Sequence, residues 1–131
     1  MSPKAAGLHD WNLAADALED AYDAVVITNA QLEPPGPTIV YVNRAFEALT
    51  GYPAEEALGN TPRMLQGPLT DRKVLDELKA ALSSGAKWSG QAVNYRKDGS
   101  TFLLEWRIAP VRDDAGHITH FVSFQRDAGA G

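Results

Sequence analysis

The sequence contains no cysteine among its 131 residues. This absence excludes disulfides, thiolate metal sites, a cysteine nucleophile and any covalent thiol adduct. Positive charge is also scarce, because 12 Lys and Arg residues stand against 17 Asp and Glu residues, for a formal net charge of -5. We therefore expect no nucleic-acid partner, since binding a phosphate backbone needs a surplus of positive charge.

Long apolar runs are missing as well. No stretch approaches the roughly 20 apolar residues of a membrane span, and the start "MSPKAAGLHDW" has no signal-peptide hydrophobic region. We expect no membrane contact and a cytoplasmic location. His9, His117 and His120 show no metal-ligand spacing, and no motif assembles a nucleophile with a base and an orienting acid. Neither a metal site, a catalytic residue nor an enzyme is therefore expected.

The length and the 44% hydrophobic content suit one ordinary domain with a sizeable core. The patterns predict strands in residues 24–28, 38–42, 87–96, 101–111 and 118–127, and short helices in 43–51 and 53–59. A longer helix is predicted in 71–85, with Thr70 as its cap, and an N-terminal helix begins after Asp10. This order predicts an α+β fold with a five-stranded antiparallel sheet and helices on one face.

The last predicted strand carries apolar groups on both faces. Phe121 alternates with Val122 and Phe124, so a bare outer face would expose the latter two side chains. We expect this face to be covered by the N-terminal helix, by a second copy of the protein or by a following helix.

The stretch "GNTPRMLQG", residues 59–67, has two interpretations. It is a turn in which Pro62 blocks a helix while Met64 and Leu65 fill the core. Alternatively, Arg63 and Gln66 point into a pocket.

Several stretches resemble one family: "ITNAQLEPPGPTIVYVNRAFEALTGYPAEEALGNTPRMLQGPLTD", "VNYRKDGS" and "ITHFVSFQRD". Together they look like a PAS domain of the flavin-binding LOV (light, oxygen, voltage) branch. The resemblance covers residues 24–127, between an N-terminal flanking helix in 1–23 and a tail in 128–131. The family's pattern here is G-x-N-C-R-F-L-Q-G, so Pro62 stands at the position of the photoactive cysteine and Thr61 at that of an asparagine.

The resemblance implies a flavin, FMN or FAD, as cofactor. Arg63 would then pair with the flavin phosphate, and Lys79 matches a second basic phosphate contact. Gln66 would hydrogen-bond the ribityl chain, with Thr61 as a shorter substitute for the missing asparagine.

For the flavin ring, Asn94 matches the first of two asparagines at the polar edge. Leu104 stands at the second position and offers only van der Waals contact. Gln125 matches the glutamine beside flavin N5. A flat apolar ring also needs apolar walls, and the candidates are Val26, Thr28, Met64, Leu65, Leu78, Leu82, Phe102 and Leu104.

Two functional hypotheses follow. In the first, the chain is a sensory input domain whose flavin responds to light or redox state by reduction, without a cysteinyl adduct, as "KWSG" and "EWRIAPV" also resemble FAD-binding PAS domains of bacterial redox regulators. Trp88, Trp106, Tyr41 and Tyr95 are candidate electron donors. In the second, favoured by Pro62, Thr61 and Leu104, it is a cofactor-free PAS dimerisation or protein-interaction module. The resemblance further implies a homodimer through the outer sheet face and N-terminal helix, and a downstream signalling output domain.

Overall fold

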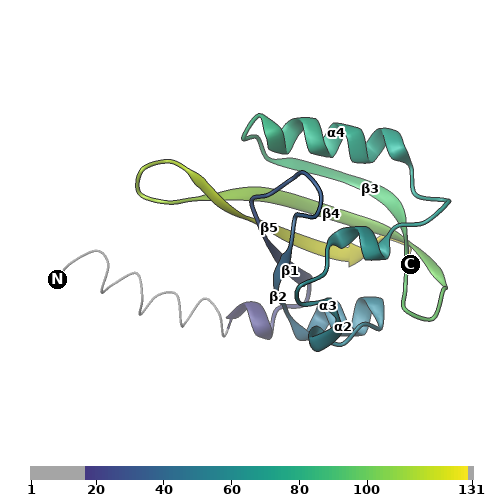
Figure 1. Ribbon diagram of the computed structural model, residues 1–131. Helices are drawn as coiled ribbons and strands as arrows, with labels where there is room; N and C mark the ends of the chain where they lie inside the picture. The colour runs from purple at the N-terminus through teal and green to yellow at the C-terminus, as the bar shows by residue number, and fades with distance from the viewer. Residues whose placement is uncertain (1–16, 130–131) are drawn as a thin grey trace.

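The computed structural model describes residues 17–129. Most of the helix predicted after Asp10 lies outside these residues. The strands are β1 (Ala24–Asn29), β2 (Ile39–Val42), β3 (Trp88–Tyr95), β4 (Thr101–Arg112) and β5 (Ile118–Asp127). The helices are α2 (Arg44–Thr50), α3 (Ala54–Ala57), the 3-10 turn η1 (Pro62–Leu65) and α4 (Arg72–Ser83), as Figure 1 shows.

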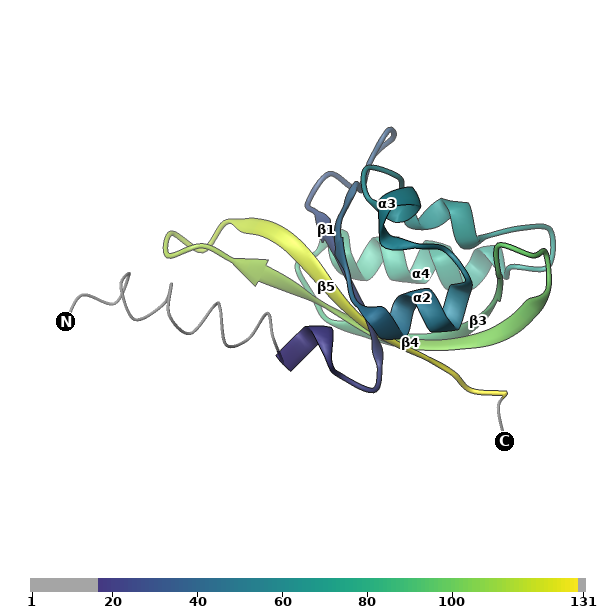
Figure 2. The ribbon, with the colours of Figure 1, turned by 90° about the horizontal axis from the view of Figure 1, so that it is seen from below.

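The five strands form one antiparallel sheet in the order β2-β1-β5-β4-β3. The predicted hairpin of β1 and β2 and the predicted meander of β3, β4 and β5 are both confirmed. The sequence patterns did not indicate that β5 joins the two units by pairing with β1, with Ala24 opposite Gln125. Helices α2, α3 and α4 lie on the same, concave side of the sheet (Figure 2). The predicted α+β fold with helices on one face is therefore confirmed.

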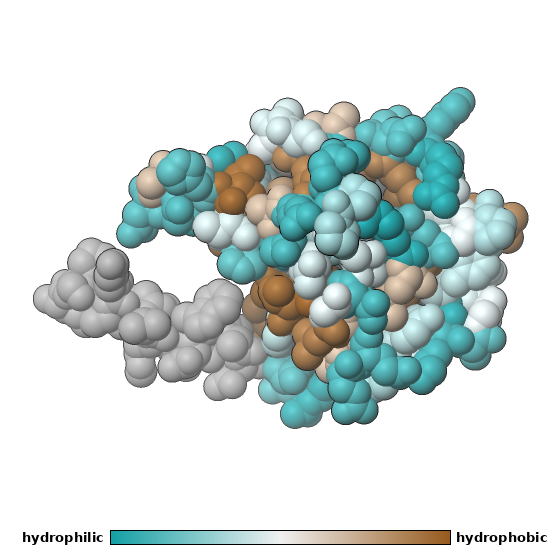
Figure 3. Space-filling model, in the orientation of Figure 1, coloured by the Kyte–Doolittle hydropathy of each residue, from teal (hydrophilic) through white to brown (hydrophobic). Residues whose placement is uncertain are grey.

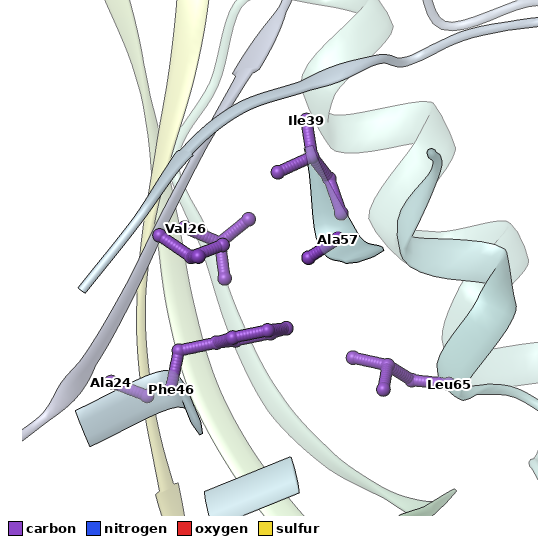
Figure 4. Packing of buried hydrophobic residues seen from close by; sticks show 7 residues of the cluster. Ala24, Val26, Ile39, Phe46, Ala57 and Leu65 are labelled. Atoms are coloured by element: carbon purple, nitrogen blue, oxygen red, sulfur yellow. The ribbon is translucent and has the colours of Figure 1, made fainter. Parts of the chain in front are cut away.

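The core consists of two clusters of buried side chains. The first lies between β1, β2 and helices α2 and α3, where side chains from separate elements point toward one another (Figure 4). The second lies on β3 and β4, and Val74 and Leu78 of α4 pack against it. The first cluster contains Ala24, Val26, Ile39, Val42, Phe46, Ala57 and Leu65, and the second contains Ala92, Phe102, Leu104 and Trp106.

Asn43 is the buried amide that starts α2, and its side chain is 1% exposed. Its Oδ1 accepts hydrogen bonds from the backbone N–H of Phe46 at 3.1 Å and of Val25 at 2.8 Å. Its Nδ2 donates to the carbonyls of Leu18 and Asp23 at 2.7 and 3.0 Å. The residue therefore ties the described start of the chain to both the sheet and the helix.

The cap of α4 differs from the prediction. Asp71, not Thr70, is the N-cap, because its carboxylate accepts the N–H of Lys73 at 2.9 Å. The Thr70 hydroxyl donates to the carbonyl of Val93 at 2.7 Å and accepts from the N–H of Gly67 at 3.0 Å. Thr70 is thus engaged with β3 and cannot also cap the helix.

The outer sheet face carries the apolar groups that the sequence pattern indicated. Val122 and Phe124 of β5 are half-buried, while Leu103 and Val111 of β4 are 37% and 40% exposed. The Arg107 guanidinium lies over the Phe124 ring, 5.0 Å from its centroid. Among helices in residues 17–129, none is long and apolar enough to cross a membrane.

Candidate functional site

A cavity of about 300 Å³ lies between the concave face of the sheet and the elements η1 and α4. Its volume falls at the lower end of the range for small-molecule sites, about 300 to 1,000 Å³. Seen from the direction of Figure 1, hydrophobic groups show in patches between polar ones (Figure 3). The apolar lining includes Val26, Leu32, Pro37, Pro62, Leu65, Leu75, Leu78, Leu82, Leu104, Trp106, Ile108 and Phe121.

The sheet supplies polar groups to the floor of the cavity. Asn94 on β3 and Gln125 on β5 line it, and each is 6% exposed. The Gln125 Nε2 donates to the Ser123 hydroxyl at 3.0 Å, whereas its Oε1 is buried with no hydrogen-bond partner in the part of the chain described. The Asn94 amide also lines the cavity, but it is not one of the fully buried groups without a partner in the described residues. Because an unpaired buried polar group costs about 1 to 3 kcal/mol, Gln125 Oε1 is suited to pairing with a polar group of a ligand.

Alternation along the strands explains why these amides meet. Gln125 pairs with Trp106 of β4, and Trp106 lies two residues beyond Leu104 on the same face. Asn94 lies two residues beyond Ala92, which pairs with Leu104. Side chains two residues apart on a strand share a face, so all of them point toward the helices.

Solvent-exposed cationic side chains also line the cavity. Arg63, Arg72 and Lys79 all line it. The Arg63 guanidinium donates to the carbonyls of Gly36 and Leu32, in the loop between β1 and β2. Arg72 Nη1 donates to Gln66 Oε1 at 3.4 Å. These three cations outnumber the one carboxylate of the lining, Asp76, so the exposed part of the cavity suits an anionic group.

The structure brings together seven of the eight residues proposed from the sequence: Thr28, Arg63, Gln66, Lys79, Asn94, Leu104 and Gln125. Thr61 is not among the lining residues, because its hydroxyl accepts the N–H of Arg63 at 3.2 Å and caps η1. Two proposed wall residues also lie elsewhere. Met64 packs against the first core cluster, and Phe102 lies beneath the Arg96 guanidinium, 4.6 Å from its ring centroid.

Sequence reasoning missed Arg72 and Ser123 as site residues, and it named Trp106 as a candidate electron donor but not as a cavity wall. Each had a usable signal. Arg72 lies seven residues before Lys79, which is two turns along one helical face. Trp106 and Ser123 each lie two residues from a proposed site residue on the same strand.

The two interpretations of residues 59–67 are both partly correct. Leu65 is 2% exposed and fills the first core cluster, as expected of a core-filling turn. Pro62, Arg63 and Gln66 line the cavity. One 3-10 turn therefore serves the core and the cavity together.

Two groups with shifted pKa values, Tyr41 and Glu105, lie away from this cavity. Burial, followed by the negative charges of Glu19 and Asp20, raises the pKa of Tyr41. On the outer face, hydrogen bonds from Arg126 and then Gln91 lower the pKa of Glu105. Within residues 17–129, no group of three or more His, Asp or Glu side chains could hold a metal ion.

An antiparallel sheet covered by helices on one face, with an apolar cavity also lined by amides and cations, defines an α+β domain with a cavity of the kind that small molecules occupy. The chain belongs to the PAS domain family, whose model matches residues 23–129. It is 39% identical over 126 residues to a blue-light-activated histidine kinase of Rhizobium johnstonii, covering 96% of this chain and 36% of that protein. It is 42% identical over 108 residues to Adagio protein 3 of Arabidopsis thaliana, covering 76% of this chain and 17% of that protein.

Solved structures give the same assignment. A light-oxygen-voltage domain studied with a flavin analogue superimposes with a TM-score of 0.82 and 36% sequence identity, covering 94% of this chain and 89% of that one. The fold is therefore that of the LOV structures. The chain spans about a third or less of the length of the two curated relatives.

Proposed function

We propose that this chain is a LOV-type sensory input domain that holds a flavin, FMN or FAD, in the cavity between the sheet and α4. One observation carries the proposal: an apolar cavity is lined on the sheet by two amides, one with an unpaired buried oxygen, and at exposed positions by three cations. A flavin has the matching chemistry, because its flat apolar ring has a polar edge and its tail is anionic. The LOV relatives make this ligand the natural candidate.

The residues divide the binding between them. The Gln125 amide would present its Nε2 donor to N5 of the oxidised ring, and the Asn94 amide would bond the polar edge of the ring. Arg63, Arg72 and Lys79 would hold the phosphate, and the two guanidinium groups also match the geometry of its oxygens. Leu104 would contact the ring without a hydrogen bond, which weakens binding relative to an amide at that place.

The bound flavin would supply blue-light absorption and redox chemistry. Because the chain contains no cysteine, we propose that the response is flavin reduction rather than a thiol adduct. Trp106 is the aromatic side chain best placed to donate an electron. Its ring lines the cavity and lies 4.8 Å from that of Trp88, centroid to centroid.

Gln125 would pass the response to the opposite face of the sheet. Beside a ring nitrogen that has gained a proton, the Gln125 amide would present its acceptor Oε1 in place of its donor Nε2, and it would do so by turning. β5 is the central strand, and its neighbouring residues Phe124 and Arg126 face the outer side. Arg126 Nε donates to Glu105 of β4 at 2.7 Å. A turn of Gln125 would therefore alter hydrogen bonds and contacts on the outer face.

That outer face would dock a second copy of the domain together with the N-terminal helix, and an output domain would follow in the whole protein. The exposure of Leu103 and Val111 supports this part of the proposal. We propose a cytoplasmic location and no enzymatic activity of the domain itself. Sedimentation of the wild type and of Phe124→Glu tests the dimer, which the charge should dissociate.

The alternative is a cofactor-free interaction module. Leu104 favours it, since this side chain is 2% exposed and presents no polar group to the cavity.

Absorption spectra of the purified protein, before and after adding FMN and then blue light with a reductant, decide between the two functions. A structured blue-region band that bleaches under light is expected for the sensor. A spectrum of free FMN, with no fluorescence quenching, would favour the interaction module.

A further inference from the structure

The loop between β1 and β2 contacts Arg63 and Lys79, two of the cations that line the cavity. Asn29 holds its base together, because the Oδ1 of Asn29 accepts the N–H of Gln31 at 3.2 Å and of Thr38 at 2.9 Å. Leu32 and Pro37 of this loop line the cavity. The loop is therefore a built part of the mouth of the cavity.

Three cations line the cavity, Arg63, Arg72 and Lys79, and their interaction partners differ in charge. The partners of Arg63 are backbone carbonyls of the loop, and that of Arg72 is the neutral amide of Gln66. Lys79 instead pairs with a charge: its Nζ lies 2.9 Å from Glu33 Oε1. Within the described chain, Lys79 is thus the lining cation bound to a carboxylate.

An anionic tail can bind Lys79 only if it displaces the Glu33 carboxylate or shares the Lys79 ammonium group with it. The Lys79 side chain is 52% exposed and that of Glu33 is 73% exposed, so the carboxylate can swing into solvent. If the Glu33 carboxylate stayed in place, a phosphate bound to Lys79 would lie beside a second negative charge. A ligand with the same ring and an uncharged tail would neither displace Glu33 nor be repelled by it.

We propose that Glu33 is a specificity-determining residue: it lowers the preference of the cavity for a flavin with a phosphate over the same flavin without one. This inference rests on the proposed function. In this role, Glu33 competes with the ligand's phosphate for the ammonium group of Lys79.

The expected effect follows from the exposure of the pair. Exposed ion pairs of this kind change equilibria by about 1.4- to 5-fold. Removing the charge of Glu33 also removes its repulsion of the phosphate, which carries a charge of about -1.5 to -2, and this adds to the change in FMN binding. Glu33→Gln should therefore tighten FMN binding about two- to fivefold and leave riboflavin binding within about 1.5-fold.

The experiment measures dissociation constants of riboflavin and FMN for the ligand-free protein, by quenching of flavin fluorescence at low salt. Glu33→Gln retains the shape and hydrogen-bonding ability of the side chain and removes its charge. Glu77→Gln is the matched control, because Glu77 is exposed on α4 and forms no ion pair within residues 17–129. The expected result is a rise in the ratio of the riboflavin to the FMN dissociation constant in Glu33→Gln alone.

A second variant tests the partner. Lys79→Gln should lower the same ratio, and Glu33→Gln should raise it by a smaller factor in that background than in the wild type. Without any ligand, nitrogen-15 NMR should show faster proton exchange of the Lys79 ammonium group in Glu33→Gln.

Each outcome is decisive. An unchanged ratio in Glu33→Gln, with both flavins bound, overturns the inference and leaves the proposed function standing. Equal tightening of both flavins also overturns it, because loosening of the loop would then be the cause. If neither flavin binds to the wild type, the proposed function fails and the inference fails with it.

Discussion

Replacing Gln125 by Leu should stabilise the ligand-free protein while it weakens flavin binding. The side chain is 6% exposed and its Oε1 has no partner within the described chain. Removing an unpaired buried acceptor gains about 1 to 3 kcal/mol, and losing the hydrogen bond to Ser123 costs about 0.5 to 1.5 kcal/mol. The free energy of unfolding should therefore rise by about 0.5 to 1.5 kcal/mol.

The same change removes a hydrogen bond to the ligand. Its loss should cost about 1 to 3 kcal/mol of binding free energy, or roughly ten- to a hundredfold in the FMN dissociation constant. Urea unfolding of the ligand-free protein gives the first quantity by linear extrapolation, and fluorescence titration gives the second. The opposite signs of the two effects distinguish a binding group from a structural one.

Gln91→Leu is the control for this pair of measurements. Gln91 lies exposed on β3 and donates to Glu105 at 3.2 Å, away from the cavity. It should change the free energy of unfolding by less than about 0.5 kcal/mol and leave FMN binding unchanged. If Gln125→Leu instead destabilised the protein by more than about 1 kcal/mol and bound FMN as the wild type does, the amide would be structural and the reasoning refuted.

Four further substitutions test other parts of the site and fold. Pro62→Cys should make bound flavin bleach under blue light and recover in the dark, because position 62 lines the cavity; a bound flavin that does not bleach would mean that this position lies away from the ring. Leu104→Asn should tighten FMN binding about tenfold and lower the unfolding free energy of the ligand-free protein by about 1 to 3 kcal/mol, since a buried amide gains a partner only with ligand. Trp106→Phe should slow light-driven flavin reduction and brighten flavin fluorescence, and an unchanged rate would exclude Trp106 as the donor. Asn43→Ala should lower the unfolding free energy by about 3 kcal/mol, because two backbone donors lose their acceptor, whereas a loss below about 1 kcal/mol would show that water replaces the side chain.

The fold was largely predictable from local pattern. β-branched runs bounded by turn residues gave the strands, and repeated leucines gave α4, because burial on one side imposes these periods. The pairing of β1 with β5 was not accessible in this way, since it joins residues about a hundred apart and depends on the whole sheet. The cap at Asp71 was missed for a similar reason: Thr70 is an equally good cap by type, and only its contact with Val93 removes it.

The candidate site was predicted by resemblance and only in part by pattern. The amides Asn94 and Gln125 stood out as polar groups in apolar strands, and the structure brings both to the cavity. Arg72 went unnoticed because a charged residue in the first turn of a helix has the same pattern whether it faces solvent or a cavity. The Glu33 contact with Lys79 could not be predicted, because the loop that makes it has no periodicity.

The two core clusters face each other across the cavity. Val26 and Leu65 of the first cluster and Leu104 and Trp106 of the second all line it. A ligand in that place would belong to both hydrophobic cores at once, and at a hundred times its dissociation constant it would add about 2.7 kcal/mol to the free energy of unfolding. Amide hydrogen exchange in β1 and in α4 should then slow together, so the ligand would strengthen the coupling of the two clusters within one cooperative folding unit.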